Sequence, residues 1–162
     1  MKLELVEVVD KNDKVLKIID RKSAKKSDIL RVSNIMIIND EDEILLQLRS
    51  ENSYNYPSYW DCSGGGHVDS GEDYFGCAKR ELFEEIGVKT ELELLGKHYI
   101  ELDDGRKHFS TFFKGKYNGE FNIDPNEVTK VQFFTKEEIK KMISNGGKFH
   151  PECLFVLNKY FY

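Results

Sequence analysis

Three carboxylates gather in one short segment of the chain. Glu81, Glu84 and Glu85 lie directly after Arg80, in the run Arg80-Glu81-Leu82-Phe83-Glu84-Glu85. On a helix, residues three and four apart share a face, and like charges at that spacing repel by a few tenths of a kcal/mol per pair. Clustered carboxylates are the ligands that Mg²⁺ or Mn²⁺ prefers. The segment therefore predicts a divalent-cation site.

The same residues would also suit an ordinary solvated helix face, because Lys79 and Arg80 could pair with the glutamates. What favours chemistry is the tripled glycine Gly64-Gly65-Gly66 upstream. Glycines let backbone amides and carbonyls approach a ligand closely, and helix N-termini attract anions. Phosphate chemistry at the loop and helix is therefore the hypothesis that the segment favours.

A helix must position the carboxylates. Asp69-Ser70-Gly71-Glu72 has the composition of a helix start, with Ser70 as the expected N-cap, and Gly87 is a natural C-terminal stop. Apolar residues recur every four positions between these ends, which predicts a stripe that faces a sheet. The stripe consists of Tyr74, Ala78, Leu82 and Ile86.

The remaining chain alternates predicted strands with predicted helices. The expected strands are 4–9 and 15–19 as an N-terminal hairpin, 30–38 and 43–48 as the centre of the sheet, 91–102 and 108–117 as a second hairpin, and 128–134. Residues 22–28 are a polar connector. Thr135 is the expected cap of one helix, with Glu138 completing a capping box, and a last helix starts at Pro151. This order predicts an α/β fold with helices on both faces of the sheet.

Composition limits the function further. The chain has 162 residues, 40% hydrophobic and 33% charged, which suits one globular domain. A net charge of −5 argues against affinity for duplex nucleic acid, and no window is apolar enough for a membrane helix. The three cysteines form no CxxC pair, and the N-terminus lacks a signal-peptide pattern, so we expect a cytoplasmic protein. We expect a monomer or a homodimer, because the N-terminal hairpin offers an edge strand.

The acidic segment carries a resemblance. Gly66, Glu72, Arg80-Glu81-Leu82, Glu84-Glu85 and Gly87-Val88 match every defined position of the Nudix box, G-x5-E-x7-R-E-U-x-E-E-x-G-U with U aliphatic. The chain resembles the Nudix hydrolases. The resemblance implies a Nudix-type α/β/α sandwich with a mixed sheet, preceded by the N-terminal β-hairpin. Residues 1–28 would be the hairpin extension and connector, and residues 29–162 the Nudix domain.

The resemblance also implies roles for the residues of the box. Nudix enzymes hydrolyse a nucleoside diphosphate linked to another group, with Mg²⁺ or alternatively Mn²⁺. By similarity, the metal ligands would be Glu81, Glu84, Glu85, the carbonyl of Gly65 and Glu127 ahead of a late strand. Glu81 would also be the general base, which Arg80 orients through an ion pair. Glu72 and Gly87 would be structural.

Substrate contacts are less strongly indicated. Arg31, Arg49, Gly66 and His67 are candidates for binding a small-molecule diphosphate, although each of the charged side chains also suits an ordinary surface. Tyr54 and Tyr56 are further candidates. Trp60 is expected to pack in the core rather than to stack on a base.

A second resemblance concerns the substrate. The runs ILRVSNIMIINDEDEILLQLRS and YPSYWDCSGGGHV look like the Nudix proteins related to isopentenyl diphosphate isomerase. Those isomerases use a cysteine near the glycine loop and upstream metal-binding histidines, and their box is degenerate. Here Cys62 is near that place, but no histidine precedes His67 and the box is intact. Hydrolysis is therefore favoured, with an isomerase-like enzyme or a non-catalytic nucleotide sensor as alternatives.

Overall fold

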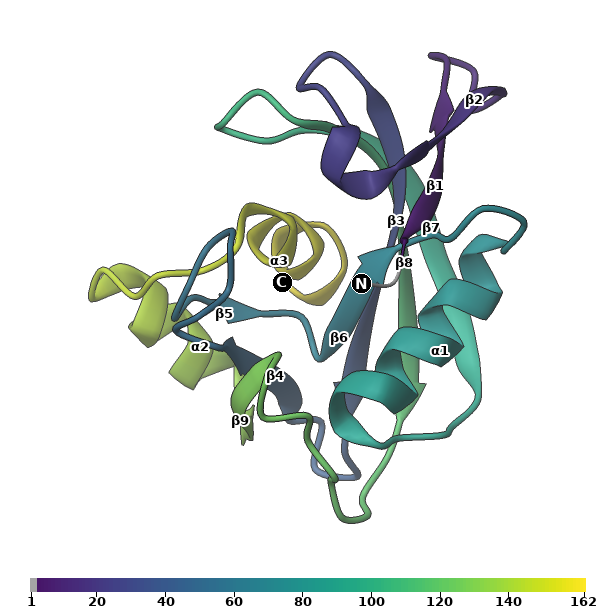
Figure 1. Ribbon diagram of the computed structural model, residues 1–162. Helices are drawn as coiled ribbons and strands as arrows, with labels where there is room; N and C mark the ends of the chain where they lie inside the picture. The colour runs from purple at the N-terminus through teal and green to yellow at the C-terminus, as the bar shows by residue number, and fades with distance from the viewer. Residues whose placement is uncertain (1–2) are drawn as a thin grey trace.

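A computed structural model describes residues 3–162 as one mixed sheet with helices on both faces (Figure 1). The strands are β1 (Leu5–Val9), β2 (Val15–Asp20), β3 (Ile29–Ile38), β4 (Ile44–Arg49), β5 (Trp60–Asp61), β6 (Gly64–His67), β7 (Leu92–Glu101), β8 (Lys107–Lys116) and β9 (Val128–Phe134). The helices are η1 (Arg21–Ser23), α1 (Tyr74–Ile86), α2 (Lys136–Ser144), α3 (Pro151–Val156) and the π-helical turn η2 (Leu157–Phe161). The predicted α/β/α sandwich is confirmed.

Strand β3 organises the sheet. It pairs antiparallel with β1, β4 and β6 and parallel with β8, over the ten residues from Ile29↔Lys107 to Ile38↔Lys116. Its apolar residues alternate between two cores: Ile35 and Ile37 pack against α1, whereas Met36 packs against α3. A strand that is covered on both faces needs the nearly continuous apolar sequence of residues 29–38. The expectation that this strand lies at the sheet centre is confirmed.

The N-terminal hairpin forms as predicted and joins the same sheet through Val9↔Ile29. Its turn is held by Asp13, which has φ +61° and whose side chain is 9% exposed. The Asp13 carboxylate accepts hydrogen bonds from Arg31 Nε at 2.7 Å, Lys97 Nζ at 2.8 Å and the Tyr74 hydroxyl at 2.8 Å. The hairpin is therefore fixed to α1, β3 and β7. Residues 1 and 2 of the predicted extension lie outside the described residues.

Helix α1 begins later than the sequence indicated. Ser70 is not its N-cap; Asp73 is, and Asp73 Oδ1 accepts the Gly76 N–H at 2.6 Å. Residues 69–72 instead form a turn, because Gly71 has φ +82° and Glu72 Oε1 accepts the Asp69 N–H. The other end is as expected, since Gly87 adopts φ +72° and donates to Phe83 O. Ala78, Leu82 and Ile86 of the predicted stripe are buried against the sheet.

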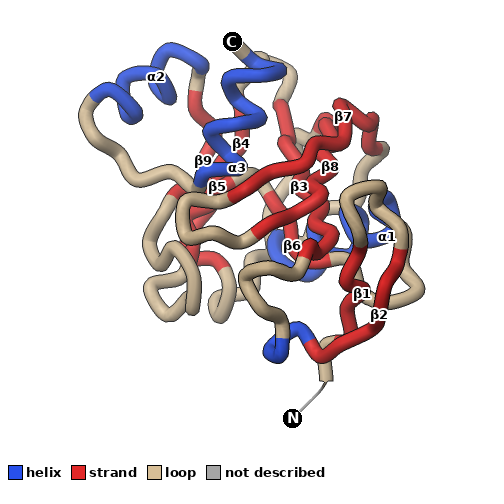
Figure 2. Tube along the Cα trace, turned by 90° about the horizontal axis from the view of Figure 1, so that it is seen from above, coloured by secondary structure: helices blue, strands red, loops and turns tan. Residues whose placement is uncertain are grey.

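The C-terminal helices cover the other face of the sheet. Thr135 caps α2 by accepting the Glu138 N–H at 3.1 Å, which confirms the capping box, and Asn145 is the C-cap. His150 caps α3, where its Nδ1 accepts the Glu152 N–H at 3.1 Å. Figure 2 shows α2 and the β1–β2 hairpin at opposite ends of the molecule. None of the helices within residues 3–162 is long and apolar enough to cross a membrane.

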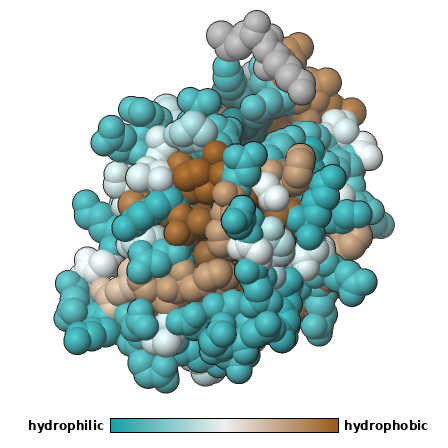
Figure 3. Space-filling view, turned by 90° about the horizontal axis from the view of Figure 1, so that it is seen from below, coloured by the Kyte–Doolittle hydropathy of each residue, from teal (hydrophilic) through white to brown (hydrophobic). Residues whose placement is uncertain are grey.

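Hydrophobic side chains are not entirely enclosed by these layers. On the hairpin, Leu16 and Ile18 of β2 are 64% and 57% exposed. The surface seen from below is mostly hydrophilic, with hydrophobic side chains gathered near its middle (Figure 3).

Candidate active site

Strand β6 brings the glycine loop against α1. It pairs with β3 through Gly64↔Ile35, Gly65↔Asn34, Gly66↔Ser33 and His67↔Val32. A Cβ atom on Gly66 would lie 2.5 Å from both Cδ and Oε1 of Glu81. Such a contact is sterically forbidden, so only glycine allows the carboxylate of Glu81 to lie against the backbone of β6.

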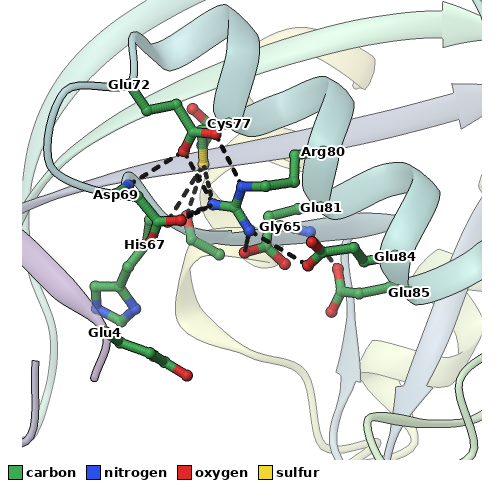
Figure 4. Close-up of polar contacts among 12 residues, drawn as sticks. Glu4, Gly65, His67, Asp69, Glu72, Cys77, Arg80, Glu81, Glu84 and Glu85 are labelled. Atoms are coloured by element: carbon green, nitrogen blue, oxygen red, sulfur yellow. Dashed lines mark hydrogen bonds and ion pairs between the residues drawn. The ribbon is translucent and has the colours of Figure 1, made fainter. Parts of the chain in front are cut away.

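Arg80 connects the acidic residues of the helix with the loop (Figure 4). Its guanidinium donates two hydrogen bonds to the Glu72 carboxylate, at 2.8 and 2.9 Å. Nη1 donates to Glu81 Oε1 at 2.8 Å and to Glu84 Oε2 at 3.3 Å, and Nη2 donates to the His67 carbonyl at 3.2 Å. The planar fork of arginine can hold several acceptors in fixed directions. Arg80 therefore fixes the orientation of Glu81, and Glu72 in turn fixes Arg80.

Glu85 is the most enclosed of the three carboxylates. It is 9% exposed, and its Oε1 accepts the Gly65 N–H at 2.8 Å. No lysine, arginine or histidine within residues 3–162 forms an ion pair with it. Burial, and then the charge of Glu81, raise the pKa of Glu85 well above its usual value of 4.5. A carboxylate this buried without a cation is costly to ionise.

Burial also disfavours the ionised form of Glu81. Its side chain is 18% exposed, and burial raises its pKa to about 7 despite the ion pair with Arg80. The charges of Glu84 and Glu127 raise this pKa further. Glu127 is exposed, and its negative charge also raises the pKa of Glu85. Four carboxylates thus share one region with a single arginine among them, which is an arrangement that fits a divalent cation.

The carboxylates do not converge tightly in the described chain. Within residues 3–162, one set of three potential ligand atoms lies mutually within 4.8 Å, and it is Asp61, Cys62 and Cys153. Asp61 is already bonded to Arg49 Nη1 at 2.9 Å and to the Cys62 N–H at 2.7 Å. This buried set belongs to the packing between β5 and α3. The predicted ligands Glu81, Glu84, Glu85, Glu127 and the Gly65 carbonyl remain predictions.

Two of the proposed substrate-binding arginines have other partners. Arg31 binds Asp13 at 2.7 Å and lies 3.6 Å from Glu7, so it holds the hairpin. Arg49 pairs with Asp61 and donates to the carbonyls of Asn55 and Tyr56, so it holds the loop before β5. The structure therefore gives both side chains a positioning role and supplies no support for substrate contact.

The aromatic candidates divide in a similar way. Tyr54 is 98% exposed. Tyr56 packs its ring on His150 with centroids 4.6 Å apart, and its hydroxyl bonds Asp103. Trp60 packs against Phe134 with centroids 5.2 Å apart, in agreement with the expected core role.

His67 has a partner that the sequence did not reveal. Its ring lies 5.5 Å from the ring of His108 on β8. Burial, followed by the charges of His108 and Arg21, lowers the pKa of His67 to about 3. His108 Nδ1 lies 3.4 Å from Glu152 Oε1 on α3, and Ser110 Oγ also donates to that carboxylate.

The sequence did not predict this second polar group, because Glu152 lies 44 residues after His108 and 42 residues after Ser110. Burial alone would raise the pKa of Glu152, but the hydrogen bonds from His108 and Ser110 lower it to about 2. A periodic signal was nevertheless available. His108 and Ser110 are two residues apart in a strand otherwise rich in phenylalanine, and they share a face of it.

Cys62 lies in the core. It is 1% exposed, and a hydrogen bond with Cys153, together with burial, raises its pKa well above the usual value of 9.0. A reactive cysteine requires an accessible thiolate. The geometry is that of a packing residue.

Comparisons with known proteins agree with the fold and the box. The NUDIX domain model matches residues 29–153. A prenyl-diphosphate phosphatase of Methanosarcina mazei is 30% identical over 129 residues, covering 76% of this chain and 74% of that protein. An isopentenyl-diphosphate delta-isomerase of Schizosaccharomyces pombe is 30% identical over 172 residues, covering 88% and 74%.

A solved structure extends the likeness over nearly the whole chain. The crystal structure of DR0079 from Deinococcus radiodurans superposes with a TM-score of 0.87, covering 98% of this chain and all of that one, at 22% identity. At that identity the likeness shows the fold alone. Together with the family match and the isomerase-related sequences, it confirms both resemblances: the chain belongs to the Nudix family of hydrolases, in the group that includes isopentenyl-diphosphate isomerases.

Proposed function

We propose that this protein hydrolyses the pyrophosphate bond of an organic diphosphate, with Mg²⁺ held by the carboxylates of α1. The observation that carries the proposal is the buried, cation-free carboxylate of Glu85 beside Glu81 and the Gly65 backbone. The negative charges of such a cluster favour binding of a hard dication, because the cation neutralises them. Glu81, Glu84 and Glu85, with the Gly65 carbonyl and Glu127, would hold the metal.

When bound, Mg²⁺ would neutralise charge on the diphosphate and lower the pKa of a water molecule. The chain's own residues would do the rest. Arg80 occupies Glu81 Oε1, which leaves Oε2 of Glu81 to accept the proton of the attacking water. The water oxygen would bond to phosphorus as the bridging P–O bond breaks.

An isomerase-like reaction is the main alternative. The burial of Cys62 and its raised pKa favour hydrolysis, because the thiol cannot reach a substrate at the glycine loop without a rearrangement of the core. Incubation with isopentenyl diphosphate and NMR analysis of the products separates the two. Isomerisation moves a double bond and releases no phosphate, whereas hydrolysis releases phosphate or a monophosphate.

The proposed function is tested with purified protein and a panel of organic diphosphates, with Mg²⁺ or with EDTA. We expect release of phosphate or monophosphate that depends on Mg²⁺ and falls by at least about 100-fold in Glu81→Gln. Glu41→Gln, a change at an exposed turn, serves as the matched control and should keep full activity. Equal rates for Glu81→Gln and the unaltered protein would refute the role of Glu81.

A further inference from the structure

Exposed hydrophobic side chains gather on the N-terminal hairpin, which lies at the edge of the molecule (Figure 1). Eleven large hydrophobic residues of the described chain are exposed, and five of these belong to residues 3–18. We call these five the hairpin patch: Leu3, Leu5, Val15, Leu16 and Ile18. Exposed hydrophobic patches with a polar rim are typical of sites that bind a protein or a membrane.

The hairpin patch lies on one face of the hairpin. Opposite residues of an antiparallel pair point to the same face, and Ile18 is opposite Glu7. Leu5 is two residues from Glu7 in β1 and therefore shares this face. Val6 and Val8 point to the other face, where they are buried. The hairpin thus packs one face against the domain and presents Leu5 and Ile18 to solvent on the other.

The sequence around the hairpin patch is basic. Residues 11–26 contain seven lysines and arginines and two aspartates, so they carry +5 in a chain whose net charge is −5. Lys14 and Lys17 flank two residues of the hairpin patch, and both are exposed. Lys17 Nζ lies 3.9 Å from an oxygen of Asp28, and none of the described residues forms an ion pair with Lys14. Positive charge therefore accompanies the hydrophobic side chains along β2.

Ion pairs leave most of this positive charge in place. Glu4 of β1 is paired with Arg21 of the segment at 2.6 Å. Asp13, one of the two aspartates, is paired with Arg31 and Lys97, which lie outside the segment. The lysines of residues 11–26 therefore keep an excess of positive charge that an external partner can neutralise.

A second copy of the chain does not suit the hairpin patch. β2 is an edge strand, but its register with β1 shifts between Val8 and Val9, and Lys17 lies near its middle. Bulges and lysines are features by which edge strands avoid pairing with one another. Face-to-face contact would bring together two segments that each carry +5, and these repel. A negatively charged partner with an apolar layer fits both the charge and the hydrophobic side chains.

We propose that the hairpin patch binds the surface of an anionic lipid bilayer. Its leucine, isoleucine and valine side chains enter the boundary between headgroups and acyl chains, while Lys11, Lys14 and Lys17 contact the lipid phosphates. Surface binding of this kind increases with the buried apolar area and with attraction to anionic lipids. The alkyl stem of lysine can lie along an apolar surface while its ammonium reaches a phosphate. The inference does not depend on the proposed function, because it concerns the hairpin alone.

The test measures binding of the full chain to vesicles by co-sedimentation, in EDTA and about 0.1 M salt. We expect binding to phosphatidylcholine vesicles that contain about 30% phosphatidylglycerol, and at least about tenfold weaker binding to phosphatidylcholine alone. Each lysine near an anionic surface contributes about fivefold in affinity, so Lys11→Gln/Lys14→Gln should bind about 25-fold more weakly. Lys140→Gln/Lys141→Gln is the matched control, because it changes the net charge equally at exposed positions of α2, at the opposite end of the molecule (Figure 2).

The hydrophobic contact is tested at two exposed positions. Leu16 and Ile18 are 64% and 57% exposed, so Leu16→Thr/Ile18→Thr should fold normally and bind at least about tenfold more weakly. Leu94 on β7 is also 57% exposed but lies outside the hairpin patch, and Leu94→Thr should bind as the unaltered protein does.

A fluorescent label tests where the chain contacts the bilayer. The three native cysteines are buried, so a polarity-sensitive fluorophore would react with an introduced surface cysteine instead. The emission of the label on Leu16→Cys should shift to the blue when anionic vesicles are added. The emission of the label on Leu94→Cys should not shift.

Several results would overturn the inference. They are no binding to anionic vesicles, equal binding to both lipid compositions, and equal binding by the hairpin variants and their controls. A dimer in analytical ultracentrifugation that Leu16→Thr/Ile18→Thr dissociates would also overturn it, because a second copy would then occupy the hairpin patch. If thermal unfolding shows that the threonine variant is misfolded, Lys11→Gln/Lys14→Gln at the exposed turn decides the question. Because no substrate is needed, failure of the proposed function would leave this result unaffected.

Discussion

The raised pKa of Glu81 makes a prediction about stability that needs no substrate. In metal-free protein, Glu81 has a pKa of about 7 when folded, against a usual value of 4.5. Between these values the folded state holds a proton that the unfolded chain has released. The contribution of Glu81 to stability must therefore fall as pH rises through this window. Glu85, whose pKa is also raised, adds to the same trend. His67, whose pKa is lowered to about 3, contributes the opposite trend below its usual value of 6.5.

The size of the effect follows from the difference between the two pKa values. At about 1.4 kcal/mol per pH unit, Glu81 accounts for at most about 3 kcal/mol of lost stability between pH 5 and pH 8. For a chain of this length that corresponds to a fall in Tm of about 6–12 °C. The carboxylates with lowered pKa values, such as Glu152 and Asp13, titrate below this window and do not contribute to it.

Glu81→Gln tests the reasoning directly. Glutamine keeps an oxygen for Arg80 but has no charge to bury, so the variant should melt at a higher temperature than the unaltered protein at pH 8 and at the same temperature at pH 5. Thermal and urea unfolding in EDTA at four pH values would measure this, with Glu41→Gln as the control. Mg²⁺ should stabilise the unaltered protein most at pH 8. Parallel Tm curves for the two proteins would refute the buried-charge account.

Three further predictions concern the groups around the site. Gly66→Ala should lower kcat at least about tenfold, because the added Cβ would lie 2.5 Å from the Glu81 carboxylate and displace it. Kinetics at saturating substrate would measure this effect, and an unchanged kcat would contradict it. Arg80→Lys should lower kcat about 10- to 100-fold, since a single ammonium cannot grip Glu72 and orient Glu81 together; the same assay with added guanidinium should restore part of the rate if orientation is the cause. Asp13→Asn should cost about 1–3 kcal/mol at pH 7 by urea unfolding, because Arg31 and Lys97 lose their shared carboxylate. Burial alone would raise the Asp13 pKa, but hydrogen bonds from Lys97, Arg31 and Tyr74 lower it, so this cost should vanish as pH falls well below 3.8.

Local patterns predicted most of the fold. The strands and the C-terminal capping box depend on neighbouring residues, so their signals are present in short segments: Val128–Phe134 was located to the residue, and Thr135 caps α2 as expected. The start of α1 was harder, because Ser70 and Asp73 are both good caps. Asp73 becomes the cap because Gly71 forms a turn and because Arg80, eight residues after Glu72, donates a hydrogen bond to the Glu72 side chain.

The candidate site was only half visible in the sequence. Glu81, Glu84 and Glu85 share one helix, so spacing alone places them in one region, although their ligand atoms do not form a set of three within 4.8 Å of one another. The polar group on the opposite side of β6 is assembled from β8 and α3, and no spacing relates His108 to Glu152. Arg31 and Arg49 show a second limit of the sequence. Their charge suggested phosphate binding, but they form ion pairs with Asp13 and Asp61, which are distant along the chain and could not be recognised as partners.

The two sides of β6 also differ in what a substitution there would disturb. Residues on the α1 side are linked through Arg80 into one hydrogen-bonded unit, so a change at one position moves the others. On the far side, Glu152 is held by His108 and Ser110 of β8, through hydrogen bonds that do not involve Arg80. A substitution that alters one side of β6 can thus leave the hydrogen bonds of the other side in place.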